Sequence, residues 1–267
     1  MKKLFSNSYT ALCFLFLYAP ILILILFSFN EQAGFKWMGF STRWYDELFH
    51  NEAIIGALVN SLIVAIVASI FATILGTTAA FGIHNMKKVS KSTIKTLTYI
   101  QILNPEIVTG ISLMLLFAYF KMQSGFLTLI LAHITFCVPT VVLSVLPKLR
   151  QMNISLYEAA MDLGCNKVQA FIKAVIPEIM PGIVSGFLMA LTYSIDDFVI
   201  SYFTAGTTSQ TLPIVIYSMT KKQVKPTIYA LTTLMFIAVL IILIIYNTID
   251  AHSEKQKMKA AGMAKKI

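Results

Sequence analysis

The chain has 267 residues, of which 57% are hydrophobic and 12% are charged, and it carries a net charge of +9. Soluble domains have about twice this fraction of charged residues, so the composition excludes an ordinary soluble domain. A soluble protein with this charge would suggest a nucleic-acid partner, but here the placement of the lysines and arginines argues against one.

Six apolar runs have lengths near the roughly 20 residues that a helix needs to cross a bilayer. They are residues 11–29, 60–83, 97–120, 126–146, 183–204 and 228–249. The sequence has no evident internal repeat. We therefore expect one all-α integral membrane domain over residues 1–267, with six transmembrane helices.

The basic residues predict the orientation of this domain. Fifteen of the 21 Lys and Arg residues lie before the first run, after the last one, or in the connections 84–96 and 147–182. The positive-inside rule then places both termini and the segment 151–177 in the cytoplasm. The basic tail, residues 250–267, is expected to be a lipid-facing anchor.

The N-terminal run is predicted to be retained as the first span. Its two leading lysines suit a secretory signal, but the apolar run is too long and lacks a small-x-small cleavage site near its end. The next connection, residues 30–59, is long, external and aromatic, and includes Trp44. The three cysteines are scattered, so we expect neither a disulfide framework nor a metal site.

Acidic residues lie inside two of the predicted spans. They are Glu106, Asp196 and Asp197. An aspartate at the centre of a span costs about 2.5 to 3.5 kcal/mol on insertion scales, so we expect these groups to face a cavity or a partner. Pro105 predicts a kink beside Glu106. The alternative for Glu106 is a structural carboxyl bonded to a freed backbone amide.

A polar stripe accompanies Asp197 if residues 183–204 form one helix. The residues on its face are Ala190, Tyr193, Ser194, Ser201 and Thr204. This stripe predicts the wall of a water-filled passage. Acids without an intramembrane Lys or Arg indicate a cationic cargo, and the nearby aromatic rings could pack methylenes or ammonium groups.

The segment from Ser155 to Pro177 is polar and lies between two apolar runs. Ser155 and Glu158 have capping-box spacing, which predicts a short helix over 156–163, and Gly164 stands where a left-handed C-cap would fall. Asn166 and Gln169 repeat the spacing and predict a second helix that ends near Pro177. Two small residues, Ala159 and Ala160, lie where the two predicted helices come close together.

This segment resembles the coupling loop of binding-protein-dependent ABC importer permeases, which reads E-A-A, three residues, G, nine residues, I-x-L-P. The residues that match in register are Glu158, Ala159, Ala160, Gly164 and Pro177, while Ala174 and Ile176 replace Ile and Leu. The resemblance implies the type I (MetI-like) permease fold and a loop that docks on a cytoplasmic ATPase. The chain lacks a G-x-x-x-x-G-K-[ST] phosphate loop, so ATP and Mg²⁺ are expected on that partner. We expect no catalytic residue, cofactor or metal here.

Three further runs resemble the C-type permease subunit of spermidine/putrescine importers. They are LNPEIVTGISL at 103–113, HITFCVP at 133–139 and YSIDDFVISYFTAG at 193–206. The resemblance implies that Glu106, Asp196, Asp197 and Trp44 belong to the substrate passage, with spermidine and putrescine both open as cargo. It also implies an ATPase homodimer, a second six-span permease, an extracytoplasmic polyamine-binding protein and a bacterial cytoplasmic membrane.

Other functions remain as alternatives. The acids could serve a stand-alone cation channel or a proton-coupled carrier, or a related importer for another cationic solute. An intramembrane aspartyl protease would need two carboxyl groups that converge from different helices. Asp196 and Asp197 are neighbours, and no G-x-G-D motif is present, so this sequence argues against a protease.

Overall fold

The computed structural model describes residues 2–34, 36–221, 226–237 and 240–241. The regular elements in these ranges are helices, with one isolated bridge between Asn30 and Phe40. The chain divides into two compact units, one of residues 53–217 and one of residues 1–52 and 218–267. The described part therefore agrees with the predicted all-α class.

The smaller unit contains α1 (Lys2–Ser28), α2 (Arg43–Phe49) and an apolar helix over Pro226–Ile237. The loop between α1 and α2 is tied by the buried amide of Asn30, which donates to the carbonyls of Gln32 and Lys36 and accepts from the amide of Met38. Residues 238–239 and 242–249 of the predicted sixth span lie outside the described residues, as does the tail 250–267.

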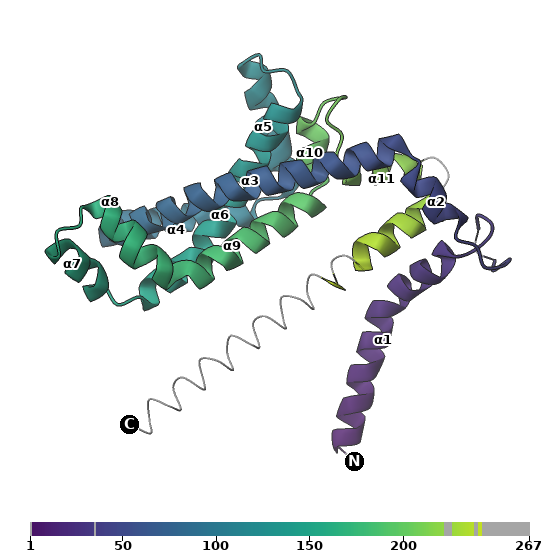
Figure 1. The fold of residues 1–267 in the computed structure, drawn as a ribbon, viewed down its shortest axis with the longest axis horizontal. Coiled ribbons are helices and arrows are strands. Elements are labelled where there is room, and N and C mark those ends of the chain that lie inside the picture. The colour runs from purple at the N-terminus through teal and green to yellow at the C-terminus, as the bar shows by residue number, and fades with distance from the viewer. Residues whose placement is uncertain (1, 35, 222–225, 238–239, 242–267) are drawn as a thin grey trace. The chain divides into compact units, whose positions relative to one another are not determined.

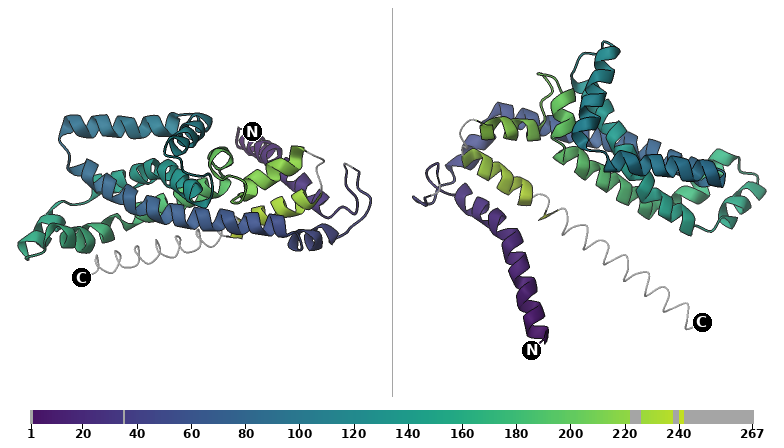
Figure 2. Two further views of the ribbon diagram at one scale, coloured as in Figure 1. Left: turned by 90° about the horizontal axis from the view of Figure 1, so that it is seen from above. Right: turned by 180° about the vertical axis from the view of Figure 1, so that it is seen from behind.

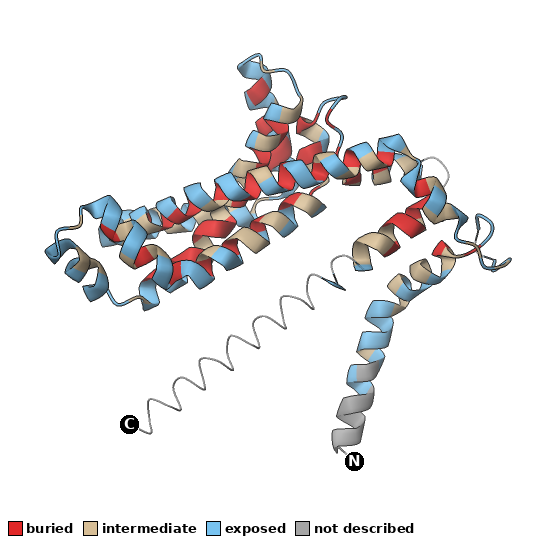
Figure 3. Ribbon diagram, viewed as in Figure 1, coloured by how far each residue is buried: buried red, intermediate tan, exposed pale blue. Residues whose placement is uncertain are grey.

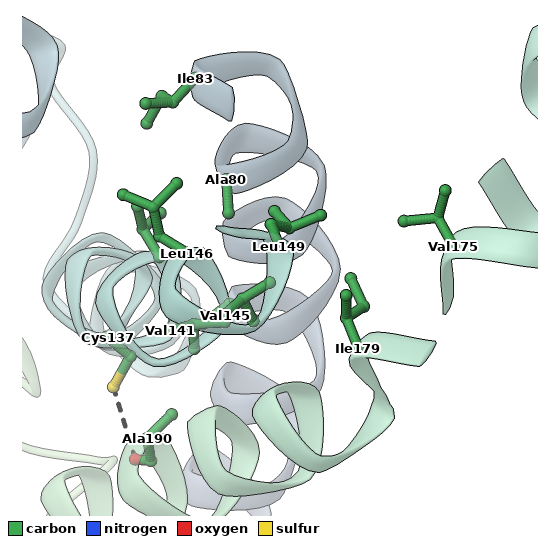
Figure 4. Packing of buried hydrophobic residues seen from close by; sticks show 12 residues of the cluster. Ala80, Ile83, Cys137, Val141, Val145, Leu146, Leu149, Val175, Ile179 and Ala190 are labelled. Atoms are coloured by element: carbon green, nitrogen blue, oxygen red, sulfur yellow. Dashed lines mark hydrogen bonds between the residues drawn. The ribbon is translucent and has the colours of Figure 1, made fainter. Parts of the chain in front are cut away.

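The larger unit is built on three long helices, α3 (Glu52–Asn85), α6 (Phe126–Gln151) and α9 (Ile176–Asp196). They run alongside one another in Figure 1, and their facing sides are the buried ones in Figure 3. The apolar cluster between them takes Ala80 from α3, Val145 from α6 and Ile179 from α9 (Figure 4). The core of this unit therefore lies along α6.

Small residues let α3 and α9 approach α6 closely. In α3 they recur every fourth position, at Ala68, Ala72, Gly76 and Ala80. Close approach through small residues is a common basis of helix packing in membranes. A Cβ atom added at Gly76 would lie 2.6 Å from Cβ of Val141 and 3.2 Å from the carbonyl oxygen of Val138. Val141 also lies against Gly186 of α9.

Gly76→Ala is expected to destabilise the larger unit by about 1 to 3 kcal/mol, because the new methyl group overlaps Val141 and a backbone carbonyl. Gly82→Ala is the matched control, since Gly82 lies on the same helix, is exposed, and has nothing within 4 Å of an added Cβ. The measurement is the thermal unfolding of the two purified variants in detergent. Equal melting temperatures would contradict the close packing of α3 on α6.

The predicted third and fifth spans are broken. The third consists of α4 (Lys88–Leu103) and α5 (Glu106–Tyr119), which meet at an angle of 102°, and the bend is visible in both views of Figure 2. The prediction of one kinked helix over 97–120 is thus wrong, because Pro105 starts a new helix instead of bending an old one. The fifth ends at Asp196, and α10 (Val199–Thr204) follows.

Within the described residues, three helices are long and apolar enough to cross a membrane, or up to four if the α4–α5 pair counts as one broken span. They are Glu52–Asn85, Phe126–Gln151 and the continuous stretch Lys167–Asp196. The connection between the predicted fifth and sixth spans contains a further helix, α11 (Leu212–Lys221).

Candidate functional site

Both broken spans place a carboxylate at a helix end. Glu106 is the first residue of α5, where the helix dipole favours an acid, and Asp196 is the last residue of α9. Asn104, at the first break, donates from Nδ2 to Oγ1 of Thr109 at 3.0 Å. Both acids are exposed in the described chain. The ends of discontinuous helices are frequent binding sites for charged cargo in transporters.

The second halves of the two broken spans pack together. A Cβ atom added at Gly110 of α5 would lie 2.9 Å from Cδ2 of Phe203 on α10. Leu113 and Phe117 of α5 join Ile200 of α10 in one apolar cluster. The two breaks are therefore held close to each other by the packing of α5 on α10.

A cavity of about 160 Å³ opens beside the first break. It is lined by Gln101, Ile102, Asn104, Glu106, Thr109, Phe136, Thr140 and Tyr193. The lining combines a carboxylate, amides, hydroxyls and two aromatic rings, and those of Phe136 and Tyr193 lie 6.2 Å apart. A carboxylate can bind an ammonium group, and the rings can pack against methylenes or interact with the cation.

The cavity unites some of the predicted passage residues. Glu106 and Tyr193 line it, and Asp196 is one helical turn beyond Tyr193 on the same side of α9. The amides at 101 and 104 and the pair Phe136 and Thr140 were not predicted. Phe136 and Thr140 are four residues apart in the predicted span 126–146, which directly follows the span that contains Glu106. This spacing puts them on one face of a helix, a signal that could have identified them.

Trp44 lies in the smaller unit. Its indole Nε1 donates to the carbonyl of Asn30 at 2.6 Å, and the guanidinium carbon of Arg43 lies 5.5 Å from the centre of its ring. The ring therefore has a fixed position within that unit, with a cation already over it.

The predicted polar stripe on one continuous helix is wrong. The backbone of Asp197 is extended, and its carboxylate accepts hydrogen bonds from the amides of Ile200 and Ser201, which starts α10. Ser194, Asp197 and Ser201 are buried inside the chain around His133 instead of facing solvent. The reason is that an aspartate caps a new helix readily by accepting from its free amides.

The segment 151–177 forms two short helices, α7 (Ser155–Asp162) and α8 (Lys167–Ala170), at one end of α6 and α9 (Figure 1). Gly164 between them has φ +88°, which confirms the predicted left-handed cap, and the amide of Cys165 donates to the carbonyl of Ala160. The reciprocal bonds of Asn166 and Gln169 are confirmed at 2.8 and 3.1 Å.

Two predictions for this segment are wrong. Ser155 does not cap α7 with Glu158, because its amide and hydroxyl both donate to Oδ1 of Asn153, and Glu158 remains exposed. The second helix does not end at Pro177 but continues through a π turn, Phe171–Val175, into α9. A π turn rearranges the hydrogen-bond ladder locally, which accommodates a residue that has no amide hydrogen.

The segment that holds the two short helices and the π turn presents apolar side chains to solvent. The most exposed are Leu163 at 86%, Val168 at 65% and Ile172 at 55%. Ala159 is also exposed and Ala160 is half-buried, so the small residues of the E-A-A motif lie at or near the surface. Exposed apolar groups of this extent are typical of a surface that another protein covers.

Comparisons with known proteins agree on one family. Residues 37–257 match the profile of the binding-protein-dependent transport system inner membrane component. The spermidine/putrescine transport system permease protein PotC of Haemophilus influenzae is 35% identical over 251 residues, 93% of this chain and 98% of its own length. The putrescine transport system permease protein PotI of Escherichia coli K12 is 38% identical over 261 residues, 95% of this chain and 93% of its own.

Solved structures share the fold. A chain of a bacterial ABC transporter that imports the acidic polysaccharide alginate matches with a TM-score of 0.72 and 12% identity, over 93% of this chain and 96% of its own. A second structure, of the alginate transporter with a pentasaccharide-bound periplasmic protein, matches with a TM-score of 0.68 and 16% identity, over 91% of each chain.

Proposed function

Because the chain belongs to the family of binding-protein-dependent transport system inner membrane components, we propose that it is a permease subunit of an ATP-driven polyamine importer. The observation that carries this proposal is the anionic and aromatic cavity at the first break, whose described lining includes no Lys or Arg. Its composition suits a cargo of ammonium groups joined by methylenes. The two relatives, named for spermidine and putrescine transport, support the same class of cargo.

The cavity would receive one end of the cargo at a time. Its volume of about 160 Å³ is below the roughly 300 to 1,000 Å³ of pockets that enclose whole small molecules. Glu106 would bind one ammonium group, Phe136 and Tyr193 would contact the adjacent methylenes, and Asp196 would attract the next ammonium group. Separate carboxylates along the path keep each contact weak enough for release.

The remaining parts of the importer follow from the family and from the bihelical segment 155–170. We infer six spans, with both termini in the cytoplasm of a bacterium, and a second permease subunit that completes the passage. The exposed E-A-A segment and the glycine elbow support docking on an ATPase dimer, which would bind ATP and Mg²⁺. A polyamine-binding protein outside the membrane would deliver the cargo.

Reconstitution into liposomes tests this function. We expect labelled spermidine or putrescine to enter only when the chain is combined with its partner ATPase, second permease and binding protein, and only with ATP. Uptake by the chain alone, without nucleotide, would instead indicate a cation channel or carrier. Competition by other organic cations distinguishes a polyamine importer from a permease for another cationic solute.

A further inference from the structure

A buried histidine bridges the second break. His133 of α6 has no exposed surface, and its Nδ1 is hydrogen-bonded to Oγ of Ser194 on α9 at 2.7 Å. Its Nε2 is hydrogen-bonded to Oγ of Ser201 on α10 at 3.0 Å. A neutral imidazole offers one donor and one acceptor, and each serine hydroxyl can play either role, so both bonds form together.

The same ring lies next to the cap of α10. Its Nε2 is 3.6 Å from Oδ2 of Asp197, whose two carboxylate oxygens accept from the amides of Ile200 and Ser201. The end of α9, the break and the start of α10 are thus all attached to one side chain of α6. Buried polar networks of this kind hold a single arrangement, because every unmade bond inside the chain is costly.

Apolar residues of α6, among them Phe136, also pack near the break, but the other hydrogen bonds from α6 side chains to α9 and α10 that the described residues make lie farther from it. Thr128 donates to the carbonyl of Thr204, at the far end of α10, and Cys137 donates from Sγ to the carbonyl of Ala190 on α9. Each of them touches one helix only. His133 is therefore the described α6 side chain that bonds to both sides of the break.

We propose that His133 is a positioning residue that fixes the direction in which the side chain of Asp196 projects from the end of α9. Asp196 lies between the two serines in the sequence and is the exposed acid of the pair, while Asp197 is buried. With the break fixed, Asp196 stays on the Tyr193 side of α9, next to the cavity. The transport part of this inference depends on the proposed function, whereas the structural part does not.

A double-mutant cycle tests whether His133 acts through Asp196. His133→Asn keeps an amide near the position of Nδ1, and His133→Gln keeps one near Nε2, so each variant retains contact with one serine. Each is expected to lower polyamine uptake about tenfold, the effect of one lost buried hydrogen bond. In either background Asp196→Asn should cost much less than it does alone, because its carboxylate is already misplaced.

The control is Cys137→Ala, which removes an α6–α9 contact one turn from His133 and touches one side of the break only. Its effect and that of Asp196→Asn on uptake should multiply. If the effects of His133→Gln and Asp196→Asn also multiply, His133 merely stabilises the fold and the proposal is overturned. If Asp196→Asn alone leaves uptake unchanged, the proposal fails as well, because there is then no acid to position.

A second measurement does not depend on the cargo. In an Asp196→Cys variant that also carries Cys13→Ser and Cys165→Ser, the thiol at 196 is labelled by a cationic thiol reagent in isolated membranes. We expect the labelling rate to change about tenfold in the His133→Asn and His133→Gln backgrounds, as the side chain at 196 moves. In the Cys137→Ala background it should stay the same. Equal rates in all backgrounds overturn the positioning role even if the cargo is not a polyamine.

Discussion

Glu106→Gln combined with Asp196→Asn is expected to reduce polyamine uptake about 100-fold, since a hydrogen bond to a charged group contributes roughly 1.5 to 3 kcal/mol and two are weakened. Both substitutions keep the size of the side chain and remove only its charge. The two residues are exposed at helix ends, so little of the fold depends on them. The assembled importer should therefore remain in the membrane in normal amounts.

Uptake of labelled spermidine and putrescine, normalised to the amount of complex, is the measurement. Asp197→Asn is the informative comparison, because Asp197 is buried and caps α10 through two oxygens. An asparagine has one oxygen for two amides, so this variant should lower the amount of folded chain rather than the uptake per complex. Full uptake by the Glu106→Gln, Asp196→Asn double variant would contradict a role for either acid in binding the cargo.

Gly164→Val is expected to abolish uptake while the chain stays in the membrane. At φ +88° a residue other than glycine is strained by about 1 to 2 kcal/mol, and a β-branched one by more. An added Cβ meets nothing within 4 Å, so the effect comes from the backbone alone. The strain would reopen the turn and change the angle between α7 and α8.

Gly164→Asn is the matched control, because asparagine adopts the left-handed conformation more readily than other non-glycine residues. It should retain a large part of the uptake. ATP hydrolysis by the purified complex is measured alongside, and we expect it to proceed without transport in the valine variant. Equal uptake by the two variants would mean that the elbow geometry does not matter for coupling.

Local signals predicted much of the bihelical segment. Gly164 and the Asn166–Gln169 box are confirmed, because a left-handed cap and a reciprocal amide pair depend on neighbours in the chain alone. The Ser155 cap failed because Asn153, two residues earlier, offers a competing acceptor. Pro177 did not end its helix because a π turn precedes it, and such a turn has no clear sequence signature.

The site was predicted less completely. Helical periodicity predicted one helix over 183–204, and the structure keeps it as far as Asp196. The prediction failed beyond Asp196, because an aspartate such as Asp197 can either continue a helix or cap a new one. The buried side chain of His133 on α6 favours the capped arrangement. His133 was visible only as part of the HITFCVP run, and its contacts are 61 and 68 residues away. Such distant contacts leave no mark in a single sequence.

The uninterrupted run of 30 residues from Lys167 to Asp196 would connect the proposed ATPase-docking segment to the proposed cargo site. At 1.5 Å per residue this rod is about 45 Å long, with the glycine elbow just before one tip and the exposed aspartate at the other. Tilting it by about 5° about the Lys167 end would move the Asp196 end by roughly 4 Å, more than a carboxylate–ammonium contact tolerates. In the proposed importer, a small displacement of the glycine elbow by the ATPase would then be enough to separate the carboxylate of Asp196 from a bound ammonium group.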